Sequence, residues 1–262
     1  MNATAPYYAD PELYDAIYAD MVADVPIHVG DAKSAGGPVL EIACGDGRVL
    51  IPMLEAGVDA EGLDLSDDML AALRRRLAER RLAARLHRAD MRDFALDRRF
   101  ALVTIPFSAF LHNLTQNDQI ATLTRCREHL LPGGRLHLSA FHPDPKLMAG
   151  FDGTSHLVKE IPNRLAPGTL RVIDAVTLDP VEQRQHVERR VEFVAPSGEV
   201  VGARELRFDL RYVYKPEMEL LLRAAGFTRW EALPMPRIGE SGPPPDRPIR
   251  EGDSLLWHAW VD

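Results

Sequence analysis

Cysteine is scarce in this sequence of 262 residues, and basic residues are fewer than acidic ones. Its two cysteines, Cys44 and Cys126, are too few for a disulfide framework or a four-cysteine zinc site. Lys and Arg number 31 against 39 Asp and Glu, which gives a net charge of −8. A chain this acidic is a poor candidate for broad binding to nucleic acids or to anionic membranes.

Long apolar runs are also missing. The longest apolar stretch spans Phe100 to Leu111, about 12 residues, which is too short to cross a membrane. The N-terminus, MNATAPYYADPELYD, is polar and acidic and shows no secretory signal. With 46% hydrophobic and 27% charged residues, the composition is that of an ordinary globular protein. We therefore expect a soluble, cytoplasmic protein with no membrane or nucleic-acid partner.

Strand-like and helix-like segments alternate from Pro38 onward, which predicts an α/β protein. Two further strands and a helix follow near the C-terminus, around a proline-rich loop at 234–252. The expectation is a Rossmann-like, seven-stranded, mostly parallel sheet flanked by helices, with right-handed crossovers. The expected strands are 39–43, 60–65, 85–88, 100–105, 135–141, 228–233 and 254–260.

The alternation stops between residues 142 and 215. Strand signals there follow one another without helices, at 170–177, 185–194 and 200–214. This block is therefore predicted to be an antiparallel β insertion after the fifth strand. We expect it to bind the substrate or to mediate oligomerisation, as the interface of a homodimer.

The first 30 residues are rich in tyrosine. Leu13, Ile17 and Met21 recur every four residues, which indicates a helix. A glycine-, alanine- and serine-rich segment, Asp31 to Pro38, follows and is predicted to be a linker. Residues 1–30 are therefore expected to form a helical lid. Its tyrosines are Tyr7, Tyr8, Tyr14 and Tyr18.

A glycine turn follows the first strand, in the segment Glu41-Ile42-Ala43-Cys44-Gly45-Asp46-Gly47. Glycines at a strand-to-helix turn let the backbone approach a ligand closely. Asp64 ends the second strand, where a carboxylate can accept hydrogen bonds from both ribose hydroxyls of a nucleoside. A dinucleotide fingerprint would need Gly or Ala where Leu50 stands, so pyrophosphate binding at this turn is disfavoured.

On these residues the sequence resembles the class I S-adenosylmethionine-dependent methyltransferases, and it is similar to amino-sugar N-methyltransferases among them. The resemblance covers 38–141 by motif and 216–262 by element order, and these two ranges are the predicted methyltransferase domain. Ala43 stands where this family more often has glycine. The matching motifs are Glu41-x-Ala43-Cys44-Gly45-x-Gly47, Gly62-x-Asp64-x-Ser66-x-x-Met69-Leu70, Asp90-Met91-Arg92-Asp93-Phe94 and Leu131-Pro132-Gly133-Gly134.

The resemblance implies S-adenosyl-L-methionine as the cofactor. It assigns the ribose hydroxyls to Asp64 and the adenine amino group to Asp90, with the adenine ring between Leu65 and Met91. The complete set of expected cofactor-binding residues is Glu41, Ala43, Gly45, Asp46, Gly47, Asp64, Leu65, Met69, Asp90, Met91, Ile105 and Phe107.

The segment after the fourth strand is where this family places methyl transfer. It carries His112, which together with Tyr14 of the lid is a candidate catalytic residue. No metal site is predicted. His142-Pro143-Asp144 is interpreted as a turn, because it lacks a third ligand. No carboxylate cluster suggests magnesium.

The predicted function is transfer of the sulfonium methyl group to a nitrogen or oxygen nucleophile of a small molecule. Because sulfur leaves as a neutral thioether, catalysis needs no leaving-group acid and rests mainly on positioning and desolvation. Two alternatives stay open: a non-catalytic protein that keeps the cofactor fold, and an NAD(P)-dependent oxidoreductase. The sequence does not identify the methyl acceptor.

Overall fold

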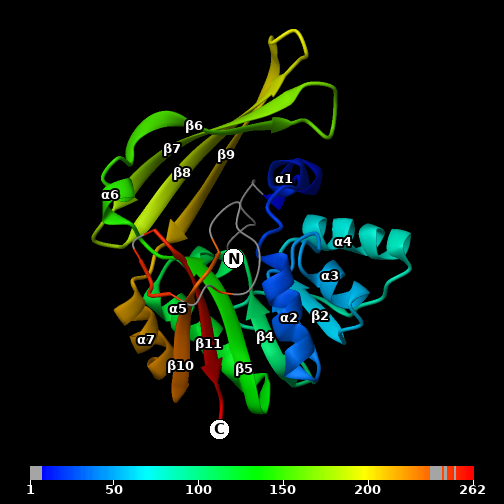
Figure 1. Cartoon of the computed structure of the whole chain (residues 1–262), viewed down its shortest axis with the longest axis vertical. Helices are drawn as coiled ribbons and strands as arrows, with labels where there is room; N and C mark the ends of the chain where they lie inside the picture. Colours follow the sequence, from blue (N-terminus) through cyan, green and yellow to red (C-terminus); the bar gives the residue numbers. More distant parts are fainter. Residues whose placement is uncertain (1–7, 237–243, 245–246, 251) are drawn as a thin grey trace.

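The computed structural model describes residues 8–236, 244, 247–250 and 252–262. Its strands form two separate sheets, a seven-stranded sheet and a four-stranded sheet that lies above it in Figure 1. The strand order of the large sheet is β10-β11-β5-β4-β1-β2-β3, and that of the small sheet is β6-β7-β8-β9. The expected fold class, a mostly parallel seven-stranded sheet with an antiparallel insertion, is confirmed.

The first five strands of the large sheet are mutually parallel, whereas β11 runs antiparallel to both β5 and β10. Strands β1 and β4 are apolar and almost wholly buried, as expected for strands covered on both faces. The strands are β1 (Val39–Ile42), β2 (Ala60–Asp64), β3 (Leu86–Arg88), β4 (Phe100–Ile105), β5 (Leu130–Phe141), β10 (Arg229–Pro234) and β11 (Ser254–Trp260).

Helices cover both faces of the large sheet. On one face, α2, α3 and α4 enclose a core that includes Val39 and Leu102. On the other face, α5 and α7 pack over Leu40 and Val103, the chain neighbours of those two residues. This division follows from the alternation of side chains along a strand. The helices are α2 (Val25–Ala35), α3 (Leu50–Glu55), α4 (Asp67–Arg80), α5 (Gln116–Glu128) and α7 (Lys215–Ala224).

The predicted linker from Asp31 to Pro38 is wrong in its first half, because α2 continues to Ala35. Gly36, in the left-handed conformation, ends the helix. Glycine, alanine and serine suggested a loop, but alanine is also the strongest helix former. The helix face that is buried here carries His28 and not a regular apolar stripe, so the periodicity was weak.

The small sheet is antiparallel throughout. Three of its strands lie where the sequence indicates them, but β6 was missed. None of its eleven residues is buried, and nine of them are exposed, so it lacks the apolar alternation that marks a half-buried strand. The strands are β6 (Asp152–Pro162), β7 (Thr169–Asp179), β8 (Arg184–Val194) and β9 (Val200–Arg211), preceded by the short helix α6 (Pro145–Met148).

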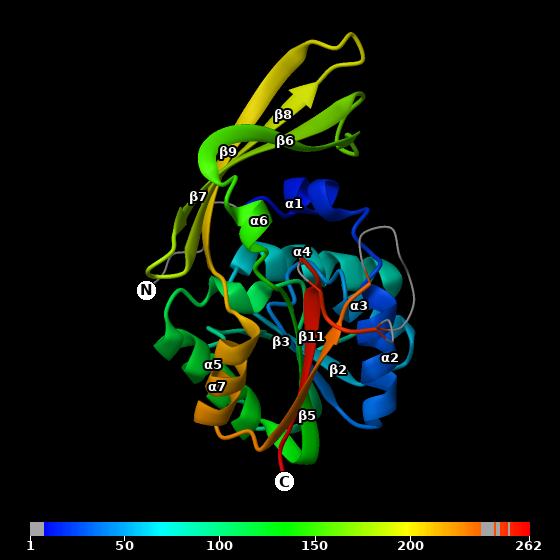
Figure 2. The ribbon, with the colours of Figure 1, turned by 60° about the vertical axis from the view of Figure 1, so that its left-hand side comes forward.

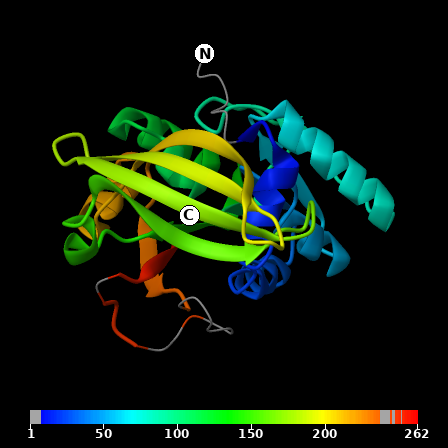
Figure 3. The same cartoon turned by 90° about the horizontal axis from the view of Figure 1, so that it is seen from above.

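Helix α1 (Pro11–Tyr18) packs mainly on the small sheet. Leu13, Ala16 and Ile17 form one buried cluster with Leu170, Val172, Val191 and Leu206 of the small sheet. Figure 2 shows α1 lying between the two sheets, and Figure 3 shows the strands of the small sheet spread over the top of the molecule. The expected N-terminal helices are present, and the first of them lies over the large sheet.

The remaining sequence expectations concern membrane-spanning helices, the proline-rich loop and the division into domains. Within the described residues, no helix is both long enough and apolar enough to span a bilayer. The proline-rich loop 234–252 lies partly outside the described residues, as does Tyr7. The division of the chain into residues 1–30, 142–215 and a methyltransferase domain stays a prediction.

Candidate active site

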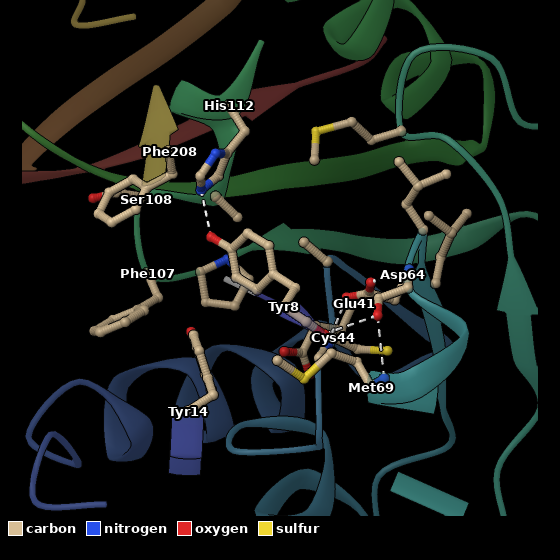
Figure 4. A pocket seen from close by; sticks show the side chains of 18 of the residues that line it. Tyr8, Tyr14, Glu41, Cys44, Asp64, Met69, Phe107, Ser108, His112 and Phe208 are labelled. Carbon is tan, nitrogen blue, oxygen red and sulfur yellow. Dashed lines mark hydrogen bonds between the residues drawn. The ribbon is translucent and has the colours of Figure 1, made fainter. Parts of the chain in front are cut away.

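A cavity of about 760 Å³ opens at the carboxyl ends of the parallel strands, beneath the small sheet. Ligands of open α/β sheets bind at this end of the strands. The walls come from β1 and β2, from the segments that follow β1, β2, β3 and β4, from the N-terminal tyrosines and from β9. Figure 4 shows side chains from these elements converging on one space.

The glycine turn after β1 forms the floor of the cavity. Ala43, Gly45 and Gly47 all have positive φ angles, of 55°, 54° and 97°. A Cβ on Gly45 would meet no protein atom within 4 Å, and this residue lines the cavity. The predicted close approach of a ligand to Gly45 therefore fits the structure.

Gly47 differs from the prediction. It does not line the cavity, and a Cβ there would lie 2.5 Å from Leu73 Cδ1 and 2.8 Å from Ile51 Cδ1. Such distances are shorter than van der Waals contact, so glycine is required by the packing of the turn against α3 and α4. Its expected role at the ligand is corrected to a structural one.

Asp64, at the end of β2, is tied to the same turn. One carboxylate oxygen accepts a hydrogen bond from Gly45 N at 2.8 Å, and the other accepts one from Ser66 N at 2.8 Å. Burial raises the pKa of Asp64, and the backbone N–H groups of Ser66, Gly45 and Leu65 oppose that shift. Each oxygen keeps a further lone pair for a ligand hydroxyl.

Acidic and basic side chains flank the glycine turn. Glu41 is buried, its Oε2 has no hydrogen-bond partner among the described residues, and burial raises its pKa. Arg48 lies in the cavity wall, pairs with Asp24 of α2 at 2.6 Å and stacks on Phe107 at 4.3 Å from the ring centroid. Asp46 pairs with Arg76 of α4 at 3.0 Å. The cavity thus contains an unsatisfied carboxyl and a charged guanidinium close to the turn.

A second group of predicted residues lines the cavity beyond β2 and β3: Leu65, Met69, Asp90 and Met91. Asp90 is held by Arg92 in a two-pronged ion pair, with Oδ1 2.9 Å from Nε and Oδ2 2.6 Å from a terminal nitrogen. Arg92 also lowers the pKa of Asp90. The carboxylate is therefore ionised and fixed, as an acceptor for an amino group must be.

The chain leaves β4 through a strained turn. Phe107 and Ser108 both have positive φ angles, of 55° and 59°, which side chains other than glycine rarely adopt. Hydrogen bonds to β5 stabilise this turn: Phe107 N donates to Ser139 Oγ at 2.9 Å, and Ser108 N donates to Ser139 O at 3.0 Å. The strain turns Phe107 into the cavity. Ile105, predicted at the cofactor, is instead completely buried in the core and does not line the cavity, because its side chain lies on the face covered by α5.

His112 ends the short 3₁₀ helix η2 (Ala109–His112) and lines the cavity. Its Nε2 lies 2.6 Å from the hydroxyl of Tyr8, as Figure 4 shows. Burial lowers the pKa of His112 from 6.5 to about 4. The imidazole is therefore neutral near neutral pH, and its Nε2 is placed to accept the proton of the Tyr8 hydroxyl.

Tyr14 of α1 also lines the cavity, as expected of the lid. Its ring centroid lies 5.7 Å from that of Tyr8 and 4.8 Å from that of Tyr18, and Tyr18 meets Phe107 edge to face at 5.2 Å. Burial raises the pKa of Tyr14 far above its ordinary value, so its hydroxyl stays protonated. These rings form a continuous aromatic wall.

The cavity residues that were not predicted as site residues include Tyr8, Arg48 and Phe208. Tyr8 was noticed only as part of the tyrosine-rich N-terminus, and Phe208 lies on β9, far from any motif. The sequence did contain a signal for Arg48: it directly follows the glycine turn, where a basic residue is placed to contact an anionic ligand.

The comparisons with known proteins address the same elements. Residues 39–134 match the family described as "Methyltransferase domain". This range contains the glycine turn, Asp64 and His112, that is, the floor and one wall of the cavity. This segment of the chain therefore resembles a methyltransferase domain.

The match to a methyltransferase domain agrees with the expected cofactor, S-adenosyl-L-methionine. Two of the residues described above fit such a ligand on structural grounds. Gly45 leaves open space where a side chain would stand, and the orphaned Oε2 of Glu41 is an acceptor for the ammonium group of a methionine moiety.

The relatives of this chain include two enzymes named as amino-sugar N,N-dimethyltransferases. The chain is 40% identical over 149 residues to the dTDP-3-amino-3,6-dideoxy-α-D-glucopyranose N,N-dimethyltransferase of Streptomyces fradiae, which covers 51% of this chain and 55% of the relative. It is 37% identical over 117 residues to the dTDP-3-amino-3,4,6-trideoxy-α-D-glucopyranose N,N-dimethyltransferase of Streptomyces venezuelae, covering 45% and 48%. The chain thus spans about half the length of the curated relatives it matches.

The solved structures extend the likeness over the whole fold. The crystal structure of DesVI from Streptomyces venezuelae superposes with a TM-score of 0.69 at 25% identity and covers 95% of this chain and 96% of that one. The matched range therefore includes the small sheet as well as the large one.

Proposed function

We propose that this chain transfers a methyl group from S-adenosyl-L-methionine to an amino nitrogen of a small molecule of the amino-sugar type. The observation that carries the proposal is the cavity, which places a neutral histidine and a tyrosine hydroxyl opposite the glycine turn and Asp64. The names of the relatives, two amino-sugar N,N-dimethyltransferases, support nitrogen over oxygen as the nucleophile.

The cofactor supplies an electrophilic methyl group on a sulfonium. The new carbon–nitrogen bond would form from the nitrogen lone pair as the carbon–sulfur bond breaks, and S-adenosylhomocysteine would be released as a neutral thioether. The methylated nitrogen then carries one proton too many. In this proposal His112, whose pKa is about 4, takes a proton from the amine side, directly or through the Tyr8 hydroxyl.

Tyr14 and Phe107 act in this proposal by excluding water and orienting the acceptor. Both line the cavity, and the pKa of Tyr14 is raised by burial, so its hydroxyl offers a hydrogen bond and no base. Orientation of two reactants in a closed site supplies up to about 7–11 kcal/mol of barrier reduction in favourable systems. We assign Asp64 and Asp90 to the ribose and adenine of the cofactor, as the sequence predicted.

Two measurements test the proposal. Calorimetric titration with S-adenosylhomocysteine should give one site per chain, whereas NAD should give none. Incubation with S-adenosylmethionine and a nucleotide-linked amino sugar should then yield the mono- and dimethylated product by mass spectrometry. Tight binding of NAD would support an oxidoreductase, and cofactor binding without methylation of any amine or hydroxyl acceptor would support a non-catalytic protein.

Variants of His112 separate chemistry from positioning. If His112 accepts the proton, His112→Ala should slow the chemical step about 10²–10⁴-fold with unchanged affinity for S-adenosylhomocysteine. An effect confined to the acceptor KM would assign it to substrate binding. The cofactor assignment has a separate test: Asp64→Ala should weaken cofactor binding about 10- to 100-fold.

The predicted homodimer through the small sheet stays part of this proposal. Exposed apolar side chains on its outer strands support it: Leu157 and Val158 on β6, and Val200 and Val201 on β9, are 42–66% exposed. Light scattering coupled to gel filtration should give twice the monomer mass, and Val158→Asp with Val201→Asp should return the monomer.

A further inference from the structure

A row of polar side chains crosses the large sheet beneath α2. Thr104, His137, His258 and Glu231 are direct neighbours on the adjacent strands β4, β5, β11 and β10. Neighbours in register point to the same face of a sheet, so these side chains lie side by side. Helix–sheet interfaces are ordinarily apolar, and this row is a polar strip within an interface that is otherwise apolar.

Helix α2 completes the row from above with Asp31. Its Oδ2 lies 2.5 Å from His137 Nδ1 and 2.8 Å from His258 Nε2. One carboxylate oxygen thus faces the ring nitrogens of two histidines that come from neighbouring strands. The three ligand-type atoms all lie within 4.8 Å of one another.

The ligand set is that of a transition-metal site. Imidazole nitrogens suit zinc, iron, cobalt, nickel and copper, whereas magnesium and calcium prefer oxygen ligands throughout. Ligands placed tetrahedrally about 2.0 Å from zinc lie about 3.3 Å apart, so the present separations need to widen by less than about 1 Å. Two histidines and one carboxylate leave the remaining coordination positions to water.

The surroundings of the three residues resemble those of built metal sites. His258 turns its other ring nitrogen, Nδ1, toward Glu231 Oε1 at 3.0 Å, the carboxylate–histidine pairing that orients metal-bound imidazoles. Arg135 holds the second oxygen of Asp31 at 3.1 Å, which fixes the carboxylate. The ring of His137 is completely buried, and within the part of the chain that the structure describes its Nε2 has no hydrogen-bond partner.

The charge around the site also suits a cation. Asp31 and Glu231 contribute two negative charges and Arg135 one positive charge, a sum of −1 before either histidine is counted. Asp31 is about one-fifth exposed, which leaves a route from solvent to its carboxylate.

We propose that Asp31, His137 and His258 bind one divalent transition metal ion, with zinc as the physiological candidate, and that this ion fastens α2 to β5 and β11. The three ligands lie 106 and 121 residues apart along the chain, and no short spacing motif connects them. The sequence prediction of no metal site is therefore replaced by this proposal.

The site is structural and not catalytic. Its link to the cavity is α2 itself, because Asp24 at the start of this helix pairs with Arg48 in the cavity wall at 2.6 Å. A metal that immobilises α2 would hold that pair in place.

The experiment uses the full chain without a polyhistidine tag, stripped with EDTA and titrated separately with Zn²⁺ and Co²⁺. The expected results are one Zn²⁺ per chain by calorimetry and by elemental analysis after gel filtration, visible absorption of bound Co²⁺, and a higher Tm with Zn²⁺. No cofactor or acceptor is present, so the outcome does not depend on the proposed methyl transfer.

Variants assign the site. Asp31→Asn and His258→Ala should lower Zn²⁺ affinity by about 100-fold or more, and Glu231→Gln by about 10- to 100-fold. His87→Ala is the matched control, because His87 makes a similar pair with Glu61, 2.7 Å apart, at the other edge of the sheet. Wild-type protein that retains no Zn²⁺ and gives no Co²⁺ absorption would overturn the proposal. Zn²⁺ affinity unchanged in both His258→Ala and Asp31→Asn would overturn it as well.

Discussion

In the large sheet, β1 and β4 are buried on both faces, whereas β6 of the small sheet is exposed along most of its length. The large sheet forms the floor of the cavity, through the backbone of the glycine turn and the carboxylates at the strand ends. The small sheet and α1 form its roof, through aromatic side chains. One region thus recognises its ligand with a fixed backbone, and the other with side chains on a helix and strands that are less enclosed.

The largest expected effect belongs to the floor. Gly45→Val should abolish cofactor binding, with affinity for S-adenosylhomocysteine reduced by more than about 100-fold. The residue has a φ of 54° and its missing Cβ faces open cavity, so valine adds both backbone strain and obstruction. Gly57→Val is the matched control, since Gly57 has a φ of 79° and open space but does not line the cavity.

Calorimetric titration of Gly45→Val and Gly57→Val with S-adenosylhomocysteine distinguishes obstruction of the cavity from backbone strain. If Gly57→Val lost cofactor affinity to the same extent as Gly45→Val, general destabilisation would explain both. If Gly45→Val bound S-adenosylhomocysteine as the wild type does, the cofactor would have to bind elsewhere.

A substitution in the roof, which consists of the small sheet and α1, should destabilise the roof without destabilising the floor. Ile17 is completely buried between α1 and the small sheet, and an Ile→Ala change of this kind costs about 2–5 kcal/mol. In Ile17→Ala, the amide hydrogens of α1 should therefore exchange faster with solvent, by an amount that corresponds to a loss of about 2–5 kcal/mol in local stability. The amide hydrogens of β1 and β4 should keep their protection.

Leu123→Ala in α5 provides the comparison for this measurement, because Leu123 packs only in the core of the large sheet. It should lower global stability without a selective effect on α1. Equal loss of protection in α1, β1 and β4 of the Ile17→Ala variant would show that roof and floor unfold as one unit.

His112 lies where floor and roof meet, and its burial predicts a dependence of stability on pH. Its pKa is about 4 in the folded chain and 6.5 in the unfolded chain, so the unfolded state takes up the proton first as pH falls. The contribution of neutral His112 to the free energy of unfolding is fully present above pH 6.5 and is lost as pH decreases toward 4. At about 1.4 kcal/mol per pH unit, the loss totals about 3 kcal/mol.

Urea unfolding of wild type and His112→Gln at several pH values measures this contribution, because glutamine does not titrate. The difference in unfolding free energy between the two should change by about 3 kcal/mol between neutral pH and about pH 4. Parallel curves would show that His112 is not buried in solution.

The smallest effect concerns Ala43, which has a φ of 55°. The left-handed conformation costs an L-residue about 1–2 kcal/mol, and glycine loses about 0.5–1 kcal/mol of backbone entropy on folding. Ala43→Gly should therefore stabilise the chain by up to about 1 kcal/mol, measured by urea unfolding. Ala60→Gly in β2, which has ordinary strand backbone, should destabilise it, and a loss of stability in both variants would contradict the assigned strain.

The sequence was most informative where burial is complete. Apolar runs such as Phe100 to Ile105 are recognisable because both faces of the strand are covered, and the glycine turn is recognisable because its residues must suit a ligand and a backbone together. The same reasoning missed β6, whose exposed residues carry no alternation. It also misjudged α2, whose buried face carries His28 at its centre.

The candidate active site also contains residues that a local motif identifies and residues that only the fold brings together. Asp64, Asp90 and Gly45 lie within short motifs and were placed correctly in the cavity wall. Tyr8 and Phe208 approach the cavity from segments 200 residues apart, and only the fold brings them together. Ile105 and Gly47 were assigned to the ligand because of their neighbours in sequence, whereas packing explains them.

The docking of α1 on the small sheet has a consequence for the order in which the chain assembles during synthesis. Ile17 leaves the ribosome 189 residues before Leu206, its partner on β9, which at about 5–20 residues per second is a delay of roughly 10 to 40 s. Strands β1 to β5 emerge within that interval and can pair with one another at once, since those pairings need no later strand. The first residues of the small sheet that cover α1, Leu170 and Val172 of β7, emerge 153 and 155 residues after Ile17, and Leu206 of β9 completes the cluster. The first helix to be made is thus among the last elements to be fully packed, and the nascent chain exposes Leu13 and Ile17 until the small sheet forms.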